Sequence, residues 1–289
     1  MVRRHELTDA AWRRIEPLLP AQPARGGRWV DHRTVLNGIL WKLATGVPWR
    51  DLPERYGNWK TVYERYRRWA ADGTFDAILT HVQVHDDSVG RIDWTVSVDS
   101  TIVRAHQHAA GARKKGASGT NRASPAAGQA LGRSRGGLTT KIHLAVDGRG
   151  LPLSIVLTPG NVNDCTAFPC VLAELAVPRP GSGRPRCRPD RVIADKAYSS
   201  AAIRRSLRDR GIAATIPERA DQKAGRARRG SRGGRPPVLD PGLYKRRNVV
   251  ERCIGRLKQW RGIATRFDKL ARNYRAAIVL VTALLWINT

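Results

Sequence analysis

The sequence predicts an α/β protein, with a mixed five-stranded sheet flanked by helices and preceded by a helical domain. Three observations lead to this fold class. Apolar residues recur at helical spacing through residues 7–80, and from Trp94 they alternate with polar residues. Beyond the first three strands, the segments alternate between helix and strand. We therefore expect a helical domain over residues 1–88 and a sheet domain over residues 89–289.

The N-terminal domain contains three main predicted helices and a short helix that opens at residues 48–53. The first covers residues 10–19, where Thr8 precedes it as a capping residue and a proline ends it. The second carries apolar residues at helical spacing and ends near Gly46. The third follows the capping residue Asn58 and covers residues 59–71. Helix, tight turn and basic helix is the order found in helix-turn-helix proteins, whose last helix enters the major groove of DNA.

Basic residues on this third helix are the expected DNA contacts of the N-terminal domain, and they are Lys60, Arg65 and Arg68. An ordinary three-helix unit with a solvated basic face would show the same pattern. The sequence alone leaves both interpretations open.

The sheet domain begins with a strand at residues 94–99, in which Asp99 lies on the more polar face. Two further strands, 139–146 and 151–157, flank a turn of sequence Asp-Gly-Arg-Gly, so a hairpin is expected. The segments that follow are a helix, a strand, a helix, a strand and a final pair of helical segments, which we place at residues 162–175, 191–195, 200–210, 212–216 and beyond 241.

Two stretches of the sheet domain lack periodicity and are rich in glycine and in basic residues. They cover residues 109–137 and 219–240, and we expect both to be loops. The first loop contains a basic run that is expected to contact DNA, namely Arg113, Lys114 and Lys115.

The overall charge favours a polyanionic partner. The chain has 52 Lys and Arg against 24 Asp and Glu, which gives a net charge of +28. Such an excess destabilises the compact state unless a polyanion such as nucleic acid neutralises it. A composition inherited from a GC-rich genome is the alternative, but it would not remove acidic residues. The longest apolar stretch, 276–287, is shorter than the roughly 20 residues that cross a bilayer, so no membrane role is expected.

Four residues near the C-terminus share one helical stripe. The positions of Tyr244, Arg247, Glu251 and Lys258 differ by three, four and seven, which returns each side chain to the same face of a helix. The adjacent stripe is apolar and would face the core. One helix therefore offers a carboxylate between two cations and a phenol, an arrangement that suits a divalent metal beside a phosphate. A surface ladder of ion pairs is the simpler alternative.

Two aspartates can join Glu251 at one site. Asp99 lies within the first strand, and Asp195 ends a short apolar strand, where active-site groups of α/β sheets are usually found. Chemistry on phosphodiesters with Mg²⁺ needs oxygen ligands that converge from different elements. Either aspartate alone would be interpreted as a turn residue, but the three acids together favour a metal site.

The spacing of the stripe resembles the Y-(2)-R-(3)-E-(6)-K signature of bacterial insertion-sequence DDE transposases, in particular family five. Four other segments are also similar to that family, and they are 48–53, 98–106, 158–164 and 193–198. The resemblance implies an RNase H-like fold with Asp99, Asp195 and Glu251 as a triad that binds two Mg²⁺ ions, which Mn²⁺ can replace. It also implies that Tyr244, Arg247 and Lys258 contact DNA.

By that resemblance the protein binds terminal inverted repeats, hydrolyses a phosphodiester at each transposon end and joins the free 3′ hydroxyl to target DNA. It would act as a homodimer on paired ends, in the bacterial cytoplasm at the nucleoid. Two alternatives remain: a catalytically inactive, transposase-derived repressor that only binds DNA, and an RNase H-fold nuclease without strand transfer.

Overall fold

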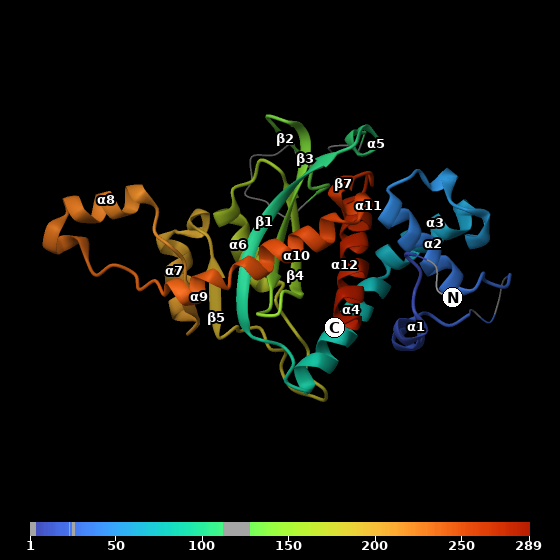
Figure 1. Ribbon diagram of the computed structural model, residues 1–289, viewed down its shortest axis with the longest axis horizontal. Coiled ribbons are helices and arrows are strands. Elements are labelled where there is room, and N and C mark those ends of the chain that lie inside the picture. The colour runs from blue at the N-terminus through green and yellow to red at the C-terminus, as the bar shows by residue number, and fades with distance from the viewer. Residues whose placement is uncertain (1–3, 23, 25–26, 112–127) are drawn as a thin grey trace.

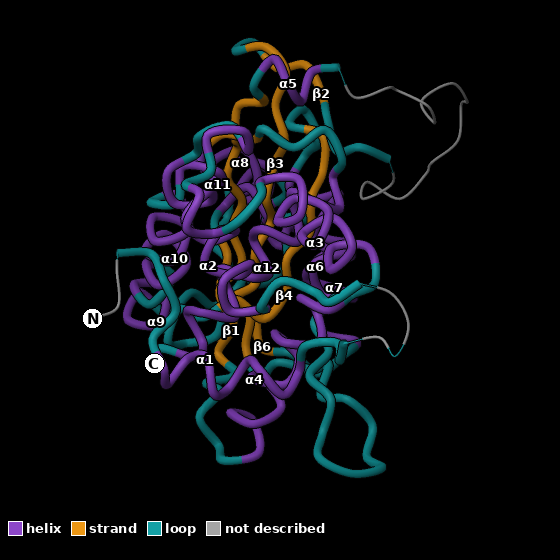
Figure 2. Tube along the Cα trace, turned by 90° about the vertical axis from the view of Figure 1, so that its right-hand side faces the viewer, coloured by secondary structure: helices purple, strands orange, loops and turns teal. Residues whose placement is uncertain are grey.

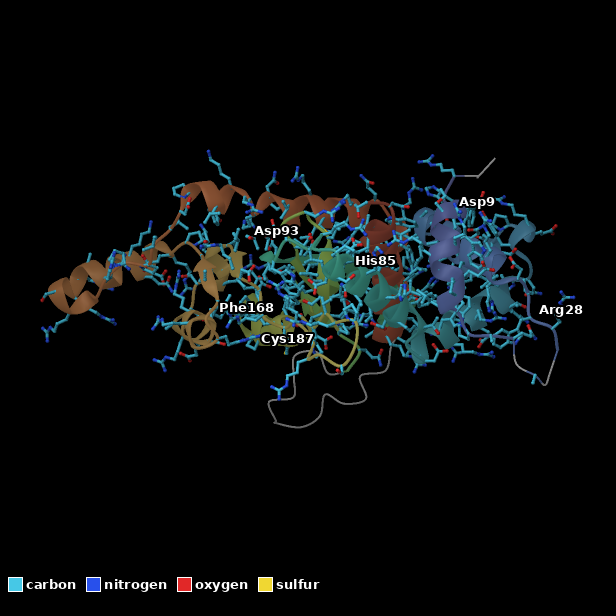
Figure 3. The ribbon with its side chains drawn as sticks, turned by 90° about the horizontal axis from the view of Figure 1, so that it is seen from below. Asp9, Arg28, His85, Asp93, Phe168 and Cys187 are labelled. Atoms are coloured by element: carbon cyan, nitrogen blue, oxygen red, sulfur yellow. The ribbon has the colours of Figure 1, made fainter. Side chains whose placement is uncertain are left out.

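The computed structural model describes residues 4–22, 24, 27–111 and 128–289. The predicted DNA contacts Arg113, Lys114 and Lys115 lie outside these residues. N-terminal helices occupy one end of the molecule, the sheet lies in the middle, and helix α8 projects at the other end (Figure 1). Viewed from below, Asp9 and Arg28 lie at the end opposite α8 (Figure 3).

The elements follow the predicted order. The helices are α1 (Asp9–Ile15), α2 (His32–Thr45), α3 (Trp59–Ala71), α4 (Thr74–Ser88), α5 (Gln107–Ala110), α6 (Asp164–Ala173), α7 (Ala201–Asp209), α8 (Ala220–Arg228), α9 (Pro241–Lys245), α10 (Asn248–Lys258), α11 (Arg261–Ala264) and α12 (Ala271–Ile287). The strands are β1 (Thr95–Ala105), β2 (Gly132–Ser134), β3 (Gly137–Val146), β4 (Pro152–Pro159), β5 (Arg191–Ala194), β6 (Ala213–Thr215) and β7 (Thr265–Arg266).

The five predicted strands form the body of the sheet in the order β4-β3-β1-β5-β6. Strand β3 is antiparallel to β1 and β4, whereas β1, β5 and β6 are parallel to one another. The predicted mixed sheet is therefore confirmed. Two short strands were not predicted: β2 pairs with the start of β3, and β7 pairs with the end of β1. With them the sheet has seven strands within the described parts of the chain.

Helices cover both sides of the sheet, with α10 on one side and α6 and α7 on the other (Figure 2). Helix α10 contacts β1 and β3, and the long α12 contacts β4 as well as α3 and α4. Because α12 is buried along almost its whole length, it joins the N-terminal helices to the sheet in one hydrophobic core.

The N-terminal helices depart from a tight helix-turn-helix. The segment between α2 and α3, residues 46–58, contains two 3-10 turns at Trp49–Asp51 and Glu54–Tyr56 instead of a short turn. A turn of the expected length comes later, between α3 and α4, where Gly73 has a φ of 82°. A left-handed backbone of this kind favours glycine, so the chain reverses sharply at that point.

The stripe near the C-terminus is divided between two helices, which corrects the prediction of one. At the junction, the N–H groups of Arg246 and Arg247 donate to carbonyls three residues earlier, at 3.1 and 3.0 Å. Hydrogen bonds to the third residue tighten the helix, so α9 ends and α10 starts at Asn248. The apolar stripe of α10 faces the core as expected, because Val250 and Leu257 are buried.

The second predicted loop, 219–240, also contains regular structure. Helix α8 and a 3-10 turn at Gly230–Gly233 lie within it. Gln222 fixes the start of α8, because its side chain accepts from the N–H of Arg219 at 3.1 Å and donates to the carbonyl of Ser199 at 2.7 Å. This anchor joins residues distant in sequence, so local composition did not reveal it.

Candidate active site

The register of the sheet brings two of the three predicted acids together. Val98 of β1 pairs with Ala194 of β5 in the parallel ladder, and Asp99 and Asp195 are the next residues on each strand. Adjacent parallel strands are about 4.8 Å apart, so the two carboxylates are neighbours. Asp195 follows its strand and accepts a hydrogen bond from the N–H of Ala197 at 2.8 Å, which orients its side chain at the strand end.

Asp99 lies in a half-buried position that disfavours its charge. Burial raises the pKa of the Asp99 carboxyl, and the negative charge of Asp195 adds to this effect. A hydrogen bond from the N–H of Ser100, at 2.8 Å, and the cation of Arg247 act in the opposite direction. A cation beside Asp99 therefore favours its ionised form and offsets part of the effect of burial.

Arg247 supplies that cation, and it connects Asp99 to the third predicted acid. Its Nη1 donates to Oδ2 of Asp99 at 2.9 Å, and its Nη2 donates to Oε1 of Glu251. The two carboxylates therefore face the same guanidinium. Although burial of Arg247 acts to lower its pKa, the charges of Asp99 and Glu251 raise it above the ordinary value.

The three acids do not form a metal cluster in this arrangement. Within the described parts of the chain, no three His, Cys, Asp or Glu residues are grouped so that they could hold one ion. Arg247 forms ion pairs with both Asp99 and Glu251. The donor set itself fits a hard divalent cation, because three carboxylates offer only oxygen and their charges already attract a cation to this place.

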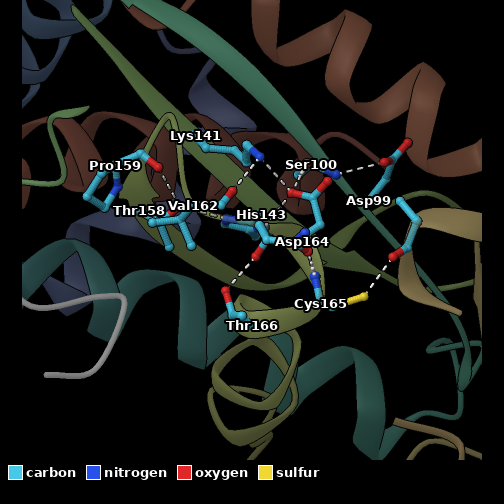
Figure 4. A network of polar contacts seen from close by, with 12 residues as sticks. Asp99, Ser100, Lys141, His143, Thr158, Pro159, Val162, Asp164, Cys165 and Thr166 are labelled. Carbon is cyan, nitrogen blue, oxygen red and sulfur yellow. Dashed lines mark hydrogen bonds and ion pairs between the residues drawn. The ribbon is translucent and has the colours of Figure 1, made fainter. Parts of the chain in front are cut away.

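A second polar network lies beside Asp99 and was not predicted as part of the site (Figure 4). Asp164, at the first turn of α6, accepts from Oγ of Ser100 and from Nζ of Lys141, each at 2.9 Å. His143, two residues after Lys141 on β3, lies 3.9 Å from the same carboxylate. The alternation of Lys141 and His143 on one face of a strand is the sequence signal that could have indicated this network.

The other residues of the stripe lie along the same helical pair. Tyr244 is partly exposed on α9. Lys258, at the end of α10, places its Nζ 3.5 Å from the carbonyl of Ile102 on β1. It forms no ion pair with any described residue, so its charge is available to an anion.

The basic residues of α3 are not equivalent. Lys60 and Arg68 are exposed. Arg65, in contrast, is only 6% exposed. Its guanidinium lies 4.1 Å from the centre of the Trp29 ring and donates to Nδ1 of His32 at 2.8 Å. This side chain therefore packs inside the helical region, and the DNA contact of Arg65 stays a prediction.

Comparison with known families covers nearly the whole chain. Residues 7–79 match the family described as a putative transposase of the IS4/5 family, and residues 91–286 match the transposase DDE domain. The second match covers more than half of the chain and implies an RNase H-like fold, in agreement with the mixed sheet flanked by helices.

Several individual proteins are similar over parts of their length. The uncharacterized protein y4sN of Sinorhizobium fredii is 43% identical over 110 residues, which are 37% of this chain and 83% of that protein. The putative transposase for insertion sequence element IS402 of Burkholderia cepacia is 36% identical over 150 residues, 52% of this chain and 64% of that protein.

A third relative, the putative transposase for insertion sequence element IS6501 of Brucella ovis, is 33% identical over 151 residues, 52% of this chain and 100% of that protein. No solved structure matches the chain. Among the described helices, none combines the length and the apolar character that a membrane span requires.

Proposed function

Because this chain belongs to the insertion-sequence transposases with a DDE domain, we propose that it binds terminal inverted repeats, cleaves the transposon ends and joins the 3′ hydroxyl ends to target DNA. The observation that carries this proposal is that Asp99, within β1, is the neighbour of Asp195, just after the end of β5, while Glu251 is linked to Asp99 through Arg247. These acids come from three separate elements, β1, the end of β5 and α10.

Asp99, Asp195 and Glu251 would hold two Mg²⁺ ions, or Mn²⁺ in their place. Such ions activate the attacking oxygen and neutralise the charge that develops on the leaving oxygen. The protein's own residues would position the DNA. Arg247 and Lys258 bind phosphates near the acids, and Tyr244 donates a hydrogen bond to the backbone or stacks on it.

Lys141 stabilises the surroundings of Asp99 by pairing with Asp164. Its ammonium, bound to Asp164 and to the carbonyl of Val162 at 2.7 Å, neutralises a further carboxylate beside Asp99. Asp164 is thereby satisfied within the protein, and the metal-binding role falls to Asp99, Asp195 and Glu251.

Double-stranded DNA is the proposed partner, and the net charge of +28 supports its binding. Lys60 and Arg68 on α3 contact the terminal repeat through phosphates and groove edges. A homodimer would hold two ends together, in the cytoplasm at the nucleoid. The basic run Arg113, Lys114 and Lys115 stays in this proposal as a further set of phosphate contacts.

The test incubates the purified chain with Mg²⁺ or Mn²⁺, a labelled duplex carrying the element's terminal repeat and a target plasmid. Strand-transfer products support the proposal. Cleavage without joining indicates a nuclease, and salt-sensitive binding without cleavage indicates a repressor.

Two variants sharpen this test. Glu251→Gln should abolish both cleavage and joining while binding persists, because it removes one proposed ligand and keeps the side-chain shape. Asp209→Asn makes the same charge change at the exposed end of α7 and should remain active. If Glu251→Gln transfers strands at the normal rate, the assignment of the three acids is wrong.

A further inference from the structure

Arg247 occupies the space between two of the three proposed metal ligands. Its guanidinium binds Oδ2 of Asp99 at 2.9 Å and Oε1 of Glu251, and only 18% of its side chain is exposed. The guanidinium is thus enclosed by the same oxygens that a divalent ion would need. The sequence signature does not require the contact between Arg247 and Asp99, since the spacing alone would only place Arg247 and Glu251 side by side on a helix.

Binding of Arg247 and binding of an ion by these carboxylates compete with each other. A divalent cation takes carboxylate oxygens at about 2.0–2.6 Å, and a guanidinium hydrogen-bonded to Oδ2 of Asp99 and Oε1 of Glu251 occupies part of that space. The two positive charges would also repel each other. Asp99, whose side chain is only 22% exposed, loses a cation when Arg247 leaves, which disfavours its charge unless another cation replaces it.

A DNA phosphate is the partner that can draw Arg247 away from the acids. Guanidinium and phosphate form two parallel hydrogen bonds, a geometry that compensates for the lost contacts with Asp99 and Glu251. The surroundings attract such a phosphate. Lys258, on the same stripe as Arg247, forms no ion pair with the described residues, and its Nζ lies 3.5 Å from the carbonyl of Ile102 on β1.

We propose that Arg247 couples metal binding to DNA binding: without DNA it holds the acids in place of the metal, and a DNA phosphate releases it so that the ions can enter. This inference rests on the proposed function. Because coupling between two ligands is reciprocal, DNA should strengthen metal binding, and metal should strengthen DNA binding by the same factor. The arrangement would restrict hydrolysis to the DNA-bound protein.

The test measures Mn²⁺ binding by the loss of its free electron paramagnetic resonance signal, with and without a duplex of mixed sequence. Binding by the duplex alone is subtracted. For the unaltered protein, the duplex should tighten Mn²⁺ binding by about fivefold or more. Arg247→Gln should bind Mn²⁺ tightly without DNA, and the duplex should add little.

Arg246→Gln is the matched control. Arg246 precedes Arg247, pairs with Asp93 and makes no contact with Asp99, so its removal changes the net charge equally. If Arg246→Gln tightens Mn²⁺ binding as much as Arg247→Gln, or if the duplex has no effect on the unaltered protein, the coupling is refuted. Circular dichroism establishes that both variants are folded.

Asp195→Asn separates this inference from the proposed function. Asp195 makes no contact with Arg247 among the described residues, so its loss tests the metal site itself. If Asp195→Asn binds Mn²⁺ as well as the unaltered protein does, the metal-binding triad is wrong and the coupling falls with it. If Asp195→Asn loses Mn²⁺ while Arg247→Gln resembles Arg246→Gln, the metal site stands and only the coupling is rejected.

Discussion

Asp99 and Asp195 extend from adjacent parallel strands at the same level of the sheet, because the residues immediately before them, Val98 and Ala194, are paired. The two acids are far apart in sequence and approach only when β1 and β5 form their ladder. The sheet therefore builds this part of the site, and α10 adds Glu251 from one side of it.

Replacing Asp195 by asparagine should reduce DNA cleavage by on the order of a thousandfold, because a neutral amide cannot hold the cation that stabilises the transition state. The N–H of Ala197 can still donate to the amide oxygen, so the turn after β5 should remain. Single-turnover cleavage of a labelled end duplex measures the effect. Affinity for that duplex in the absence of metal should change little, and a parallel loss of binding would argue for a structural role instead.

The sequence located the strands and the helix that carry the three acids, but not the relation of these acids to Arg247. Strand and helix periods are local patterns, so the strands that carry Asp99 and Asp195 could be located from them. The position of Arg247 depends on a tertiary contact with Asp99 and on a tightened helical turn, which are features that no local pattern specifies. The same reason explains α8, whose anchoring contacts come from Ser199, and the polar network of Lys141, whose partner lies on another element.

Arg65 and Lys60 should respond differently to replacement by alanine, although both lie on α3. Arg65→Ala removes the stacking on Trp29 and the hydrogen bond to His32, and should lower the unfolding free energy by about 1–3 kcal/mol. Lys60→Ala should leave stability within about 0.5 kcal/mol. It should instead lower the slope of log K against log salt by about 0.9, the value for one phosphate contact.

Urea unfolding and fluorescence anisotropy at several salt concentrations measure these two effects. Equal salt slopes for the Lys60→Ala variant and the unaltered protein would remove Lys60 from the DNA interface. A loss of stability in Lys60→Ala as large as that in Arg65→Ala would show that α3 acts only as a structural helix.

Two buried groups of the sheet should give opposite pH dependences. Asp147 is fully buried in the β3–β4 turn, and burial raises its pKa to about 6. Its stabilising contribution is present below the usual pKa of 3.8 and is lost as the pH rises through about 6. His143 is also fully buried, and burial lowers its pKa to about 4. Its contribution is present above 6.5 and is lost as the pH falls through about 4.

Each shift of about two units corresponds to about 3 kcal/mol at most. Asp147→Asn should therefore gain stability relative to the unaltered protein as the pH rises from about 4 to about 7, and His143→Gln should lose it. Urea unfolding at a series of pH values measures both differences. Parallel curves for a variant and the unaltered protein would mean that the replaced group does not change its proton affinity on folding.

The N-terminal helices should not fold without the rest of the chain. Tyr66 of α3 is fully buried and its hydroxyl donates to the carbonyl of Asn273 on α12. Arg14 donates to the carbonyl of Ile287 at 3.0 Å, and α4 packs along α12. A fragment of residues 1–88 would expose this apolar surface to water, and the lost burial would cost more than so small a unit can offset.

Thermal unfolding of the 1–88 fragment, followed by circular dichroism, should show a shallow slope without a cooperative transition, whereas the full chain should melt cooperatively. Tyr66→Phe in the full chain provides an internal check, because it should lower the unfolding free energy by about 1 kcal/mol through the missing hydrogen bond. A sharp melt of the fragment would mean that α12 only docks against helices that are already folded. In that case the N-terminal helices could move independently of the sheet. A contact of Lys60 with DNA would then not fix the position of Asp99 relative to that DNA.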